Sequence, residues 1–111
     1  MTDAELAAHL AQVAGTILIE VRESGMFEGK ALGQAGDQTA NQFLVHALRE
    51  QRPEDGLLSE ESKDTAERLS KERVWIVDPV DGTREYGEAR TDWAVHVALC
   101  VNGKPEIGAV A

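Results

Sequence analysis

The chain has 111 residues, of which 42% are hydrophobic and two are tryptophan, so its size and apolar content predict one compact domain over residues 1–111. Its formal net charge of −9 argues against binding to the phosphate backbone of nucleic acids, which requires a basic face. The single cysteine, Cys100, excludes an intramolecular disulfide.

The first residues carry no pattern of a cleavable signal. Thr2-Asp3-Ala4-Glu5 is an acidic helix start of the capping-box type, whereas a signal peptide begins with basic residues. No run of the sequence approaches the roughly 20 consecutive apolar residues that span a bilayer. We therefore expect a cytoplasmic protein without a membrane helix.

Two helices are expected in the first half of the chain. Apolar residues recur at steps of three and four from Leu6, which predicts an amphipathic helix ending near Ser24. A second helix is predicted to begin near Asp37, which could be its N-cap, and to end before Pro53. Between them, glycines at positions 25, 29, 33 and 36 predict a loop that could act as a mobile lid containing Lys30.

The second half of the chain reads as strands. Apolar residues alternate with smaller ones over residues 94–101, and Asn102-Gly103 then predicts a hairpin turn. Further strands are predicted at residues 57–58, 74–77 and 106–110, with an exposed helix or loop over the charged residues 62–73. The expected fold class is layered α+β, with two N-terminal helices packed on a mainly antiparallel sheet.

The strand predicted at residues 74–77 runs directly into two aspartates. Pro79 fixes one backbone torsion between Asp78 and Asp81, so both carboxylates can be directed at one point. Hard oxygen ligands of this kind suit Mg²⁺, which takes one or two carboxylates together with water and substrate phosphate. The carbonyl oxygen of Val80 could add a ligand, so this segment predicts a magnesium site.

Gly82 and Thr83 follow the aspartates where a helix or turn would begin. Their N–H groups could hold a phosphate oxygen, and Gly82 leaves no side chain in the approach. Alternatively, Asp-Pro-x-Asp-Gly is a surface turn, because these residue types dominate turns for local backbone reasons. The phospho-aspartyl hydrolase signature also ends in Asp-Gly-Thr, but its aspartates are closer together, which argues against it.

A second acidic element follows the apolar pair Leu57-Leu58. Two strands that both end in acids favour one shared site, with Glu60 as a further metal ligand. In the alternative, Ser59 is a helix N-cap, and Glu60 and Glu61 are first-turn acids that complement the helix dipole.

Two side chains near the segment from Asp78 to Thr83 also have alternative roles. His96 lies on the small-residue face of its predicted strand, where it could be a ligand or an acid, although structural packing is favoured. Arg84 could contact a substrate phosphate, or it could pair with Glu85 or Glu88.

These motifs resemble those of the inositol monophosphatase and fructose-bisphosphatase superfamily of Mg²⁺-dependent phosphatases. Residues 75–83 match its hallmark, Trp-Ile-x-Asp-Pro-[Ile/Leu/Val]-Asp-Gly-Thr, at every fixed position. Glu60-Glu61-Ser62 is similar to its Glu-Glu element, and Gly36-Asp37-Gln38 is similar to its N-terminal acidic motif. The resemblance implies the N-terminal part of the layered inositol monophosphatase fold and hydrolysis of a phosphomonoester.

The resemblance also implies a metal-binding role for several residues. Glu60, Asp78 and the Val80 carbonyl would hold a first Mg²⁺, while Asp78 and Asp81 would reach toward a second. In such a site one ion activates water and the other stabilises the leaving oxygen.

The remaining implied roles concern water, phosphate and substrate. Asp37 and Thr83 would position the attacking water, and the backbone amides of Gly82 and Thr83 would bind the phosphate. Residues 83–86, Thr-Arg-Glu-Tyr, are similar to the branch that removes the 3'-phosphate of 3'-phosphoadenosine 5'-phosphate to give AMP. Inositol monophosphate is the nearest alternative substrate.

Members of the superfamily are longer than this chain and take another metal-ligand aspartate from a Trp-Asp motif in their second half. No Trp-Asp pair occurs here. We therefore expect residues 1–111 to be an inositol monophosphatase-like N-terminal domain, with a non-catalytic metal-binding fragment as the alternative. The expected partners are a small-molecule phosphate monoester and, through an unpaired strand edge, further copies in a homo-oligomer, with no nucleic acid and no membrane.

Overall fold

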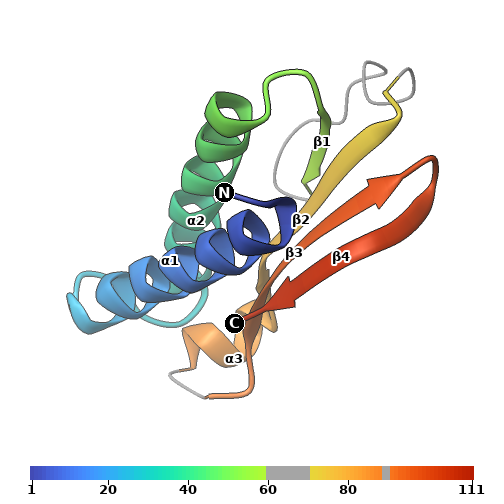
Figure 1. Cartoon of the computed structure of the whole chain (residues 1–111). Coiled ribbons are helices and arrows are strands. Elements are labelled where there is room, and N and C mark those ends of the chain that lie inside the picture. Colours follow the sequence, from blue (N-terminus) through green and yellow to red (C-terminus); the bar gives the residue numbers. More distant parts are fainter. Residues whose placement is uncertain (60–70, 89–90) are drawn as a thin grey trace.

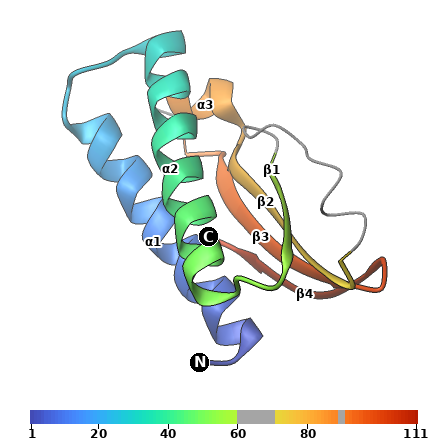
Figure 2. The same cartoon turned by 90° about the horizontal axis from the view of Figure 1, so that it is seen from above.

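The computed structural model describes residues 1–59, 71–88 and 91–111. In these parts of the chain, two long helices cover one face of a four-stranded sheet, and a short third helix lies at one end of it (Figure 1 and Figure 2). The elements in chain order are α1 (Asp3–Glu23), α2 (Gly29–Gln51), β1 (Gly56–Ser59), β2 (Arg73–Asp81), α3 (Thr83–Gly87), β3 (Ala94–Val101) and β4 (Lys104–Val110).

The sheet has the strand order β1-β2-β3-β4. β1 pairs with β2 in parallel, and the two other pairings are antiparallel. α1 packs over β3 and β4, while α2 packs over β1 and β2. Two helices on one face of a mainly antiparallel sheet confirm the predicted fold class.

α1 begins and ends where the sequence predicts. Thr2 Oγ1 accepts a hydrogen bond from the N–H of Glu5 at 3.1 Å, and Glu5 Oε1 accepts one from the N–H of Thr2 at 3.0 Å. The helix closes at the C-cap residue Ser24. Contrary to expectation, α1 is long and apolar enough to cross a membrane by length and composition alone. A single such helix near the N-terminus is weak evidence for a membrane span, because the core helix of a soluble protein and a signal sequence pass the same test. α1 buries a leucine and alanine face in the core.

α2 begins at Gly29 rather than near Asp37, so the predicted start of this helix and most of the predicted glycine-rich lid are wrong. Lys30 lies in the first turn of α2, and Asp37 lies inside the helix instead of capping it. Glycine disfavours a helix interior, because its backbone loses more freedom on folding than that of other residues. That local cost predicted a loop here, and tertiary packing overrides it.

The packing partner of the glycines is α3. A Cβ atom added to Gly36 would lie 2.5 Å from Tyr86 Cε1, and one added to Gly33 would lie 2.9 Å from Thr83 Cγ2. Real side chains do not tolerate such contacts, so the glycine face of α2 is what lets α3 approach. The glycines therefore position the segment that follows the two aspartates.

The strands match most predicted bounds. β3 covers residues 94–101 as predicted, and Asn102 (φ 52°) and Gly103 (φ 80°) form the expected turn in the left-handed region. β2 extends beyond the predicted residues 74–77, so both aspartates lie within the strand rather than after it. β4 also begins earlier than predicted, at Lys104. The predicted connection at 62–73 lies mostly outside the described residues.

A network of charged side chains joins the start of α1, the end of α2 and the start of β2. Asp3 accepts hydrogen bonds from Arg52 Nε and Arg73 Nη2, both at 3.0 Å. Arg73 Nε also donates to Asp55 Oδ1 at 3.1 Å, and Asp55 Oδ2 accepts from Trp75 Nε1 at 2.9 Å. The hydrogen bond from Arg73, supported by that from Arg52, lowers the pKa of Asp3 below its ordinary value.

Changing Asp3 to asparagine is expected to lower the free energy of unfolding by about 1 kcal/mol at neutral pH, because two ion pairs lose their charge. Since the folded-state pKa of Asp3 is depressed, this stabilisation is fully present above the unfolded-state value of 3.8 and is lost as the pH falls through the lower folded-state value. Urea unfolding of both proteins from about pH 6 to about pH 3 should show the difference shrinking.

The control for this experiment is Glu20→Gln on the same helix. This change also removes one negative charge, but it leaves the bonds from Arg52 and Arg73 to Asp3 in place. A stability difference for Asp3→Asn that stays constant over the pH range would contradict the assignment to the charged carboxylate.

Candidate active site

Asp78 and Asp81 lie on β2 where its pairing with β3 becomes irregular. In a regular strand, residues three positions apart point to opposite faces of the sheet. Asp78 pairs with His96 and Asp81 pairs with Ala94, so β2 takes three steps where β3 takes two. This β-bulge places both aspartates on one face, because their partners are two residues apart and share a face.

The shared face is the one opposite the helices. Val95 and Val97 on β3 are fully buried and point toward α1, so the alternating His96 points to the other side. Pro79 and Val80, the residues inside the bulge, are buried. A proline lacks the N–H that a regular central strand needs, so Pro79 is the feature of the sequence that marks the bulge.

The turn after Asp81 depends on Gly82. Its φ of 90° lies in a region that other residues rarely adopt, and a Cβ atom there would come within 2.9 Å of the Asp92 carbonyl oxygen. α3 begins at the next residue, Thr83, which confirms the expectation that a helix or turn starts here.

Asp37 of α2 meets Thr83 at the start of α3. The Asp37 residue is only 7% exposed. Thr83 Oγ1 lies 3.1 Å from Asp37 Oδ2 and 3.1 Å from the carbonyl oxygen of Val80, so its one hydroxyl proton can be donated to either acceptor. The fold thus brings together an acid and a hydroxyl that are 46 residues apart in the chain.

Aromatic packing holds α3 in place. The Tyr86 hydroxyl donates a hydrogen bond to the carbonyl oxygen of Leu18 at 2.6 Å, and burial raises the pKa of Tyr86 above its ordinary value, so the phenol keeps its proton. The ring of Trp93 lies edge-on to that of Tyr86 at 5.2 Å. The Arg22 guanidinium lies over both rings, 5.4 Å and 5.3 Å from their centroids. α1 and α3 are therefore fixed to each other beside Thr83.

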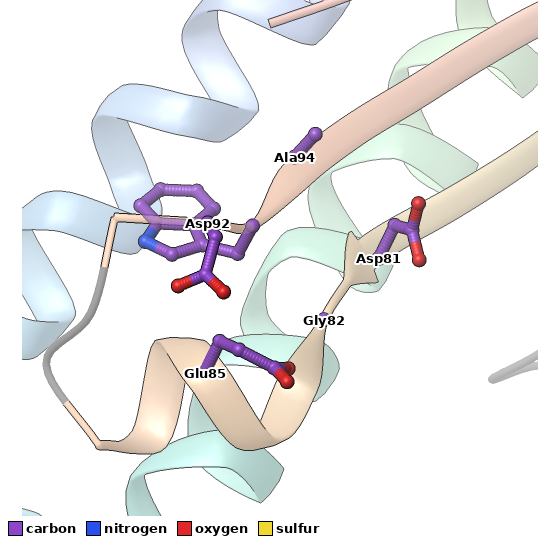
Figure 3. A pocket seen from close by; sticks show the side chains of 6 residues that line it. Asp81, Gly82, Glu85, Asp92 and Ala94 are labelled. Atoms are coloured by element: carbon purple, nitrogen blue, oxygen red, sulfur yellow. The ribbon is translucent and has the colours of Figure 1, made fainter.

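An open cavity of about 480 Å³ lies between α3 and the start of β3, next to Asp81 and Gly82. Figure 3 shows the carboxyl groups of Glu85 and Asp92 pointing into this space, while the carboxyl group of Asp81 points away from them. Trp93 also lines it. So many carboxylates repel an anionic phosphate, which could approach this end of the sheet only together with a cation.

The oxygen donors on β2 fit Mg²⁺ in kind. Asp78 is half-buried, the Asp81 side chain is 64% exposed, and the Val80 carbonyl lies between them in the chain. Within the described ranges 1–59, 71–88 and 91–111, no three Asp, Glu, His or Cys side chains form a complete metal-binding group. Glu60, the further ligand predicted from the sequence, lies outside the described residues.

β1 nevertheless leads toward the same end of the sheet. Its last residue, Ser59, pairs with Val77 in the parallel ladder, one residue before Asp78. The Ser59 hydroxyl is hydrogen-bonded to Asn41 Oδ1 of α2. The two strands that precede acids in the sequence are therefore neighbours, and the shared site predicted for them stays a prediction.

The sequence of the chain is similar to those of known proteins. The family described as the inositol monophosphatase family matches residues 2–111. The chain belongs to the inositol monophosphatase family. A relative in Mycobacterium leprae, a 3'-phosphoadenosine 5'-phosphate phosphatase, is 56% identical over 101 residues, which cover 89% of this chain and 37% of that protein. The 3'(2'),5'-bisphosphate nucleotidase CysQ of Salmonella typhimurium is 33% identical, over 96% of this chain and 46% of that protein.

A solved structure in the inositol monophosphatase family agrees with these matches. CysQ from Bacteroides thetaiotaomicron has a TM-score of 0.86 and 29% identity to this chain, and the match covers 97% of this chain and 41% of that one. The chain thus spans less than half the length of these three relatives.

The family hallmark occupies the bulge, the turn and the start of α3. Asp78, Val80 and Asp81 lie on β2, and Gly82 and Thr83 form the turn into α3. Asp37 joins this group from α2.

Two polar residues beside the hallmark received alternative interpretations from the sequence. Arg84 forms an exposed ion pair with Glu88 at 3.2 Å, one of the two pairings that the sequence allowed. His96 Nε2 lies 3.1 Å from Asp81 Oδ2, a contact that the preferred interpretation as packing missed. The sequence placed His96 only on the small-residue face of its strand, and its register with Asp78 becomes visible in the structure.

Proposed function

We propose that this chain contributes the metal- and phosphate-binding part of a phosphomonoesterase that removes the 3'-phosphate of 3'-phosphoadenosine 5'-phosphate, giving AMP and phosphate. The observation that carries the proposal is the β-bulge that sets Asp78 and Asp81 on one face, directly before the Thr83–Asp37 pair. The name of the 56% identical Mycobacterium leprae relative supports the nucleotide substrate. The hard oxygen donors support Mg²⁺ as the cofactor.

In this proposal Asp78, Asp81 and the Val80 carbonyl, together with Glu60, hold Mg²⁺. When bound, the ion neutralises negative charge on the phosphate and lowers the pKa of a water molecule. The backbone amides of Gly82 and Thr83 bind a phosphate oxygen, because the first N–H groups of a helix have no carbonyl partner within it.

Thr83 and Asp37 act on the attacking water. The Thr83 hydroxyl donates its proton toward the buried Asp37 carboxylate, which leaves the hydroxyl oxygen free to accept a hydrogen bond from water. The water is thereby oriented. As the water attacks, its proton passes to Thr83 Oγ1 while the hydroxyl proton of Thr83 passes to Asp37. Because Asp37 is buried, bulk water has little access to that carboxylate.

Two alternatives have specific support. Inositol monophosphate as the substrate is favoured by the name of the matching family. A non-catalytic, metal-binding role is favoured by the extent of the match, because the chain covers only 37% of the Mycobacterium leprae relative.

We further propose that the protein is cytoplasmic, acts on a small molecule, binds neither nucleic acid nor membrane, and forms a homo-oligomer. The net charge of −9 supports the absence of a nucleic-acid partner. β4 is an edge of the described sheet, and its unpaired backbone groups support pairing with a second copy.

Phosphate release tests the proposal. We expect release from 3'-phosphoadenosine 5'-phosphate to exceed release from inositol 1-phosphate and fructose 1,6-bisphosphate, and we expect a chelator to abolish it until Mg²⁺ is restored. Preferred hydrolysis of inositol 1-phosphate would support the first alternative. Metal binding without release from any of the three compounds would support the non-catalytic role.

A further inference from the structure

The side chain of His96 contacts that of Asp81, and the backbone of His96 lies opposite that of Asp78 in the sheet. Its Nε2 atom lies 3.1 Å from Asp81 Oδ2, and its backbone is in register with Asp78 across the β2–β3 ladder. Both side chains of the contact are open to solvent, with His96 41% exposed and Asp81 64% exposed. The imidazole therefore lies beside the acids on the face of the sheet that the helices leave uncovered.

Packing does not account for this contact. A buried histidine would be enclosed by neighbours on that face, whereas His96 and Asp81 meet at a surface. Ion pairs and hydrogen bonds at such exposed positions contribute only about 0–1 kcal/mol to folding, partly because two mobile side chains must be ordered. A hydrogen bond of this kind has a larger effect on metal affinity when it holds a metal-binding side chain in the orientation that binds the ion.

Asp81 is a side chain that needs such ordering. It is the last residue of β2, it follows the bulge, and the residue after it is Gly82 with its left-handed backbone. The exposed carboxylate could adopt several rotamers. A hydrogen bond from an N–H group to Oδ2 selects one of them and leaves Oδ1 available as a ligand.

We propose that His96 is a positioning residue for the metal ligand Asp81, acting through an Nε2–H donor to Asp81 Oδ2. The inference rests on the proposed function, because it takes Asp81 as a metal ligand. This proposal adds a residue of β3 to the proposed site, whose other described residues come from β2, α2 and the turn into α3. The neutral imidazole suffices, since the tautomer with its proton on Nε2 supplies the donor.

The experiment is a Mn²⁺ titration of the protein followed by electron paramagnetic resonance, with Mn²⁺ standing in for Mg²⁺ as a hard divalent cation. His96→Phe removes the donor and is expected to weaken Mn²⁺ binding about 10- to 100-fold. His96→Gln places an amide N–H near the position of Nε2 and is expected to retain most of the affinity. Asp81→Asn removes the ligand charge itself and is expected to weaken binding at least as much as His96→Phe.

His9→Phe is the matched control, because His9 is exposed on α1 and the helices cover the opposite face of the sheet. Unfolding curves of the four variants establish that each is folded.

The possible results separate the two proposals. Weak binding in His96→Phe with near-normal binding in His96→Gln and His9→Phe supports the positioning role. Normal binding in His96→Phe, or equal losses in His96→Phe and His96→Gln, overturns the positioning role of His96. If Asp81→Asn still loses affinity in that case, the proposed metal site stands. If Asp81→Asn binds Mn²⁺ as well as the unchanged protein does, the metal site itself is wrong and the role of His96 fails with it.

Discussion

Asp37→Asn is expected to lower the turnover of the proposed phosphomonoester substrate by about 10²- to 10⁴-fold, the usual contribution of a positioned acid or base. The amide oxygen of asparagine can still accept the hydrogen bond that Thr83 Oγ1 now makes to Asp37 Oδ2. It cannot accept a proton from water. The expected change is therefore in kcat, measured as initial rates of phosphate release at saturating substrate and Mg²⁺.

Thr83→Ser is the matched control for this change. Serine keeps the hydroxyl and removes only the methyl group, so much of the activity should remain, whereas Thr83→Val should reduce it as Asp37→Asn does. Asp37→Asn with an unchanged kcat would contradict the assignment of this buried acid to the attacking water. A loss confined to KM would assign Asp37 to substrate binding instead.

The second large effect is expected from one methyl group on α2. Gly36→Ala should lower the free energy of unfolding by about 2 kcal/mol, because its Cβ would meet Tyr86 Cε1 at 2.5 Å and Leu18 Cδ2 at 3.0 Å. The same substitution at Gly15 of α1 should raise stability by about 0.5–1 kcal/mol, because no atom lies within 4 Å of the new Cβ and alanine favours a helix. Urea unfolding measures both variants.

The two alanine variants share one chemistry and differ only in the space around the new methyl group. If α3 does not pack against α2 as described, the contact with Tyr86 disappears and only the contact with Leu18 of α1 opposes the new methyl group, so Gly36→Ala should cost much less than about 2 kcal/mol. A cost that small would therefore contradict the docking of α3. A cost of about 2 kcal/mol would support it, and Gly36→Ala should then also disturb the Asp37–Thr83 contact one residue away.

Elements with a strong periodic pattern could be predicted from the sequence. The stripe from Leu6 and the capping box defined α1, and alternation with an Asn-Gly turn defined β3 and its hairpin. The first two turns of α2 could not be predicted this way. Glycine weakens a helix by its own propensity, and only contact with α3, from a distant part of the chain, reveals why Gly33 and Gly36 are there.

The candidate site was predictable in part for the same reason. Residue type and spacing singled out Asp78, Asp81 and Thr83, but the bulge that unites the two acids on one face becomes visible only in the pairing with β3. Asp37 came from the family resemblance and not from local pattern, which favoured an N-cap. The contact between His96 and Asp81 is set by strand register, which one strand's sequence does not encode.

The separation of 46 residues between Asp37 and Thr83 bears on the order in which the protein folds. α1 and α2 form from local hydrogen bonds and pack as neighbours in sequence, and the tight turn at Asn102 closes the β3–β4 hairpin over a short loop. The contact of α3 with α2 instead requires β2 to be in place, so its loop-closure entropy must be overcome late. We therefore expect helical content to be acquired before the Asp37–Thr83 contact during refolding, so recovery of the helical circular dichroism signal should precede recovery of metal and substrate binding.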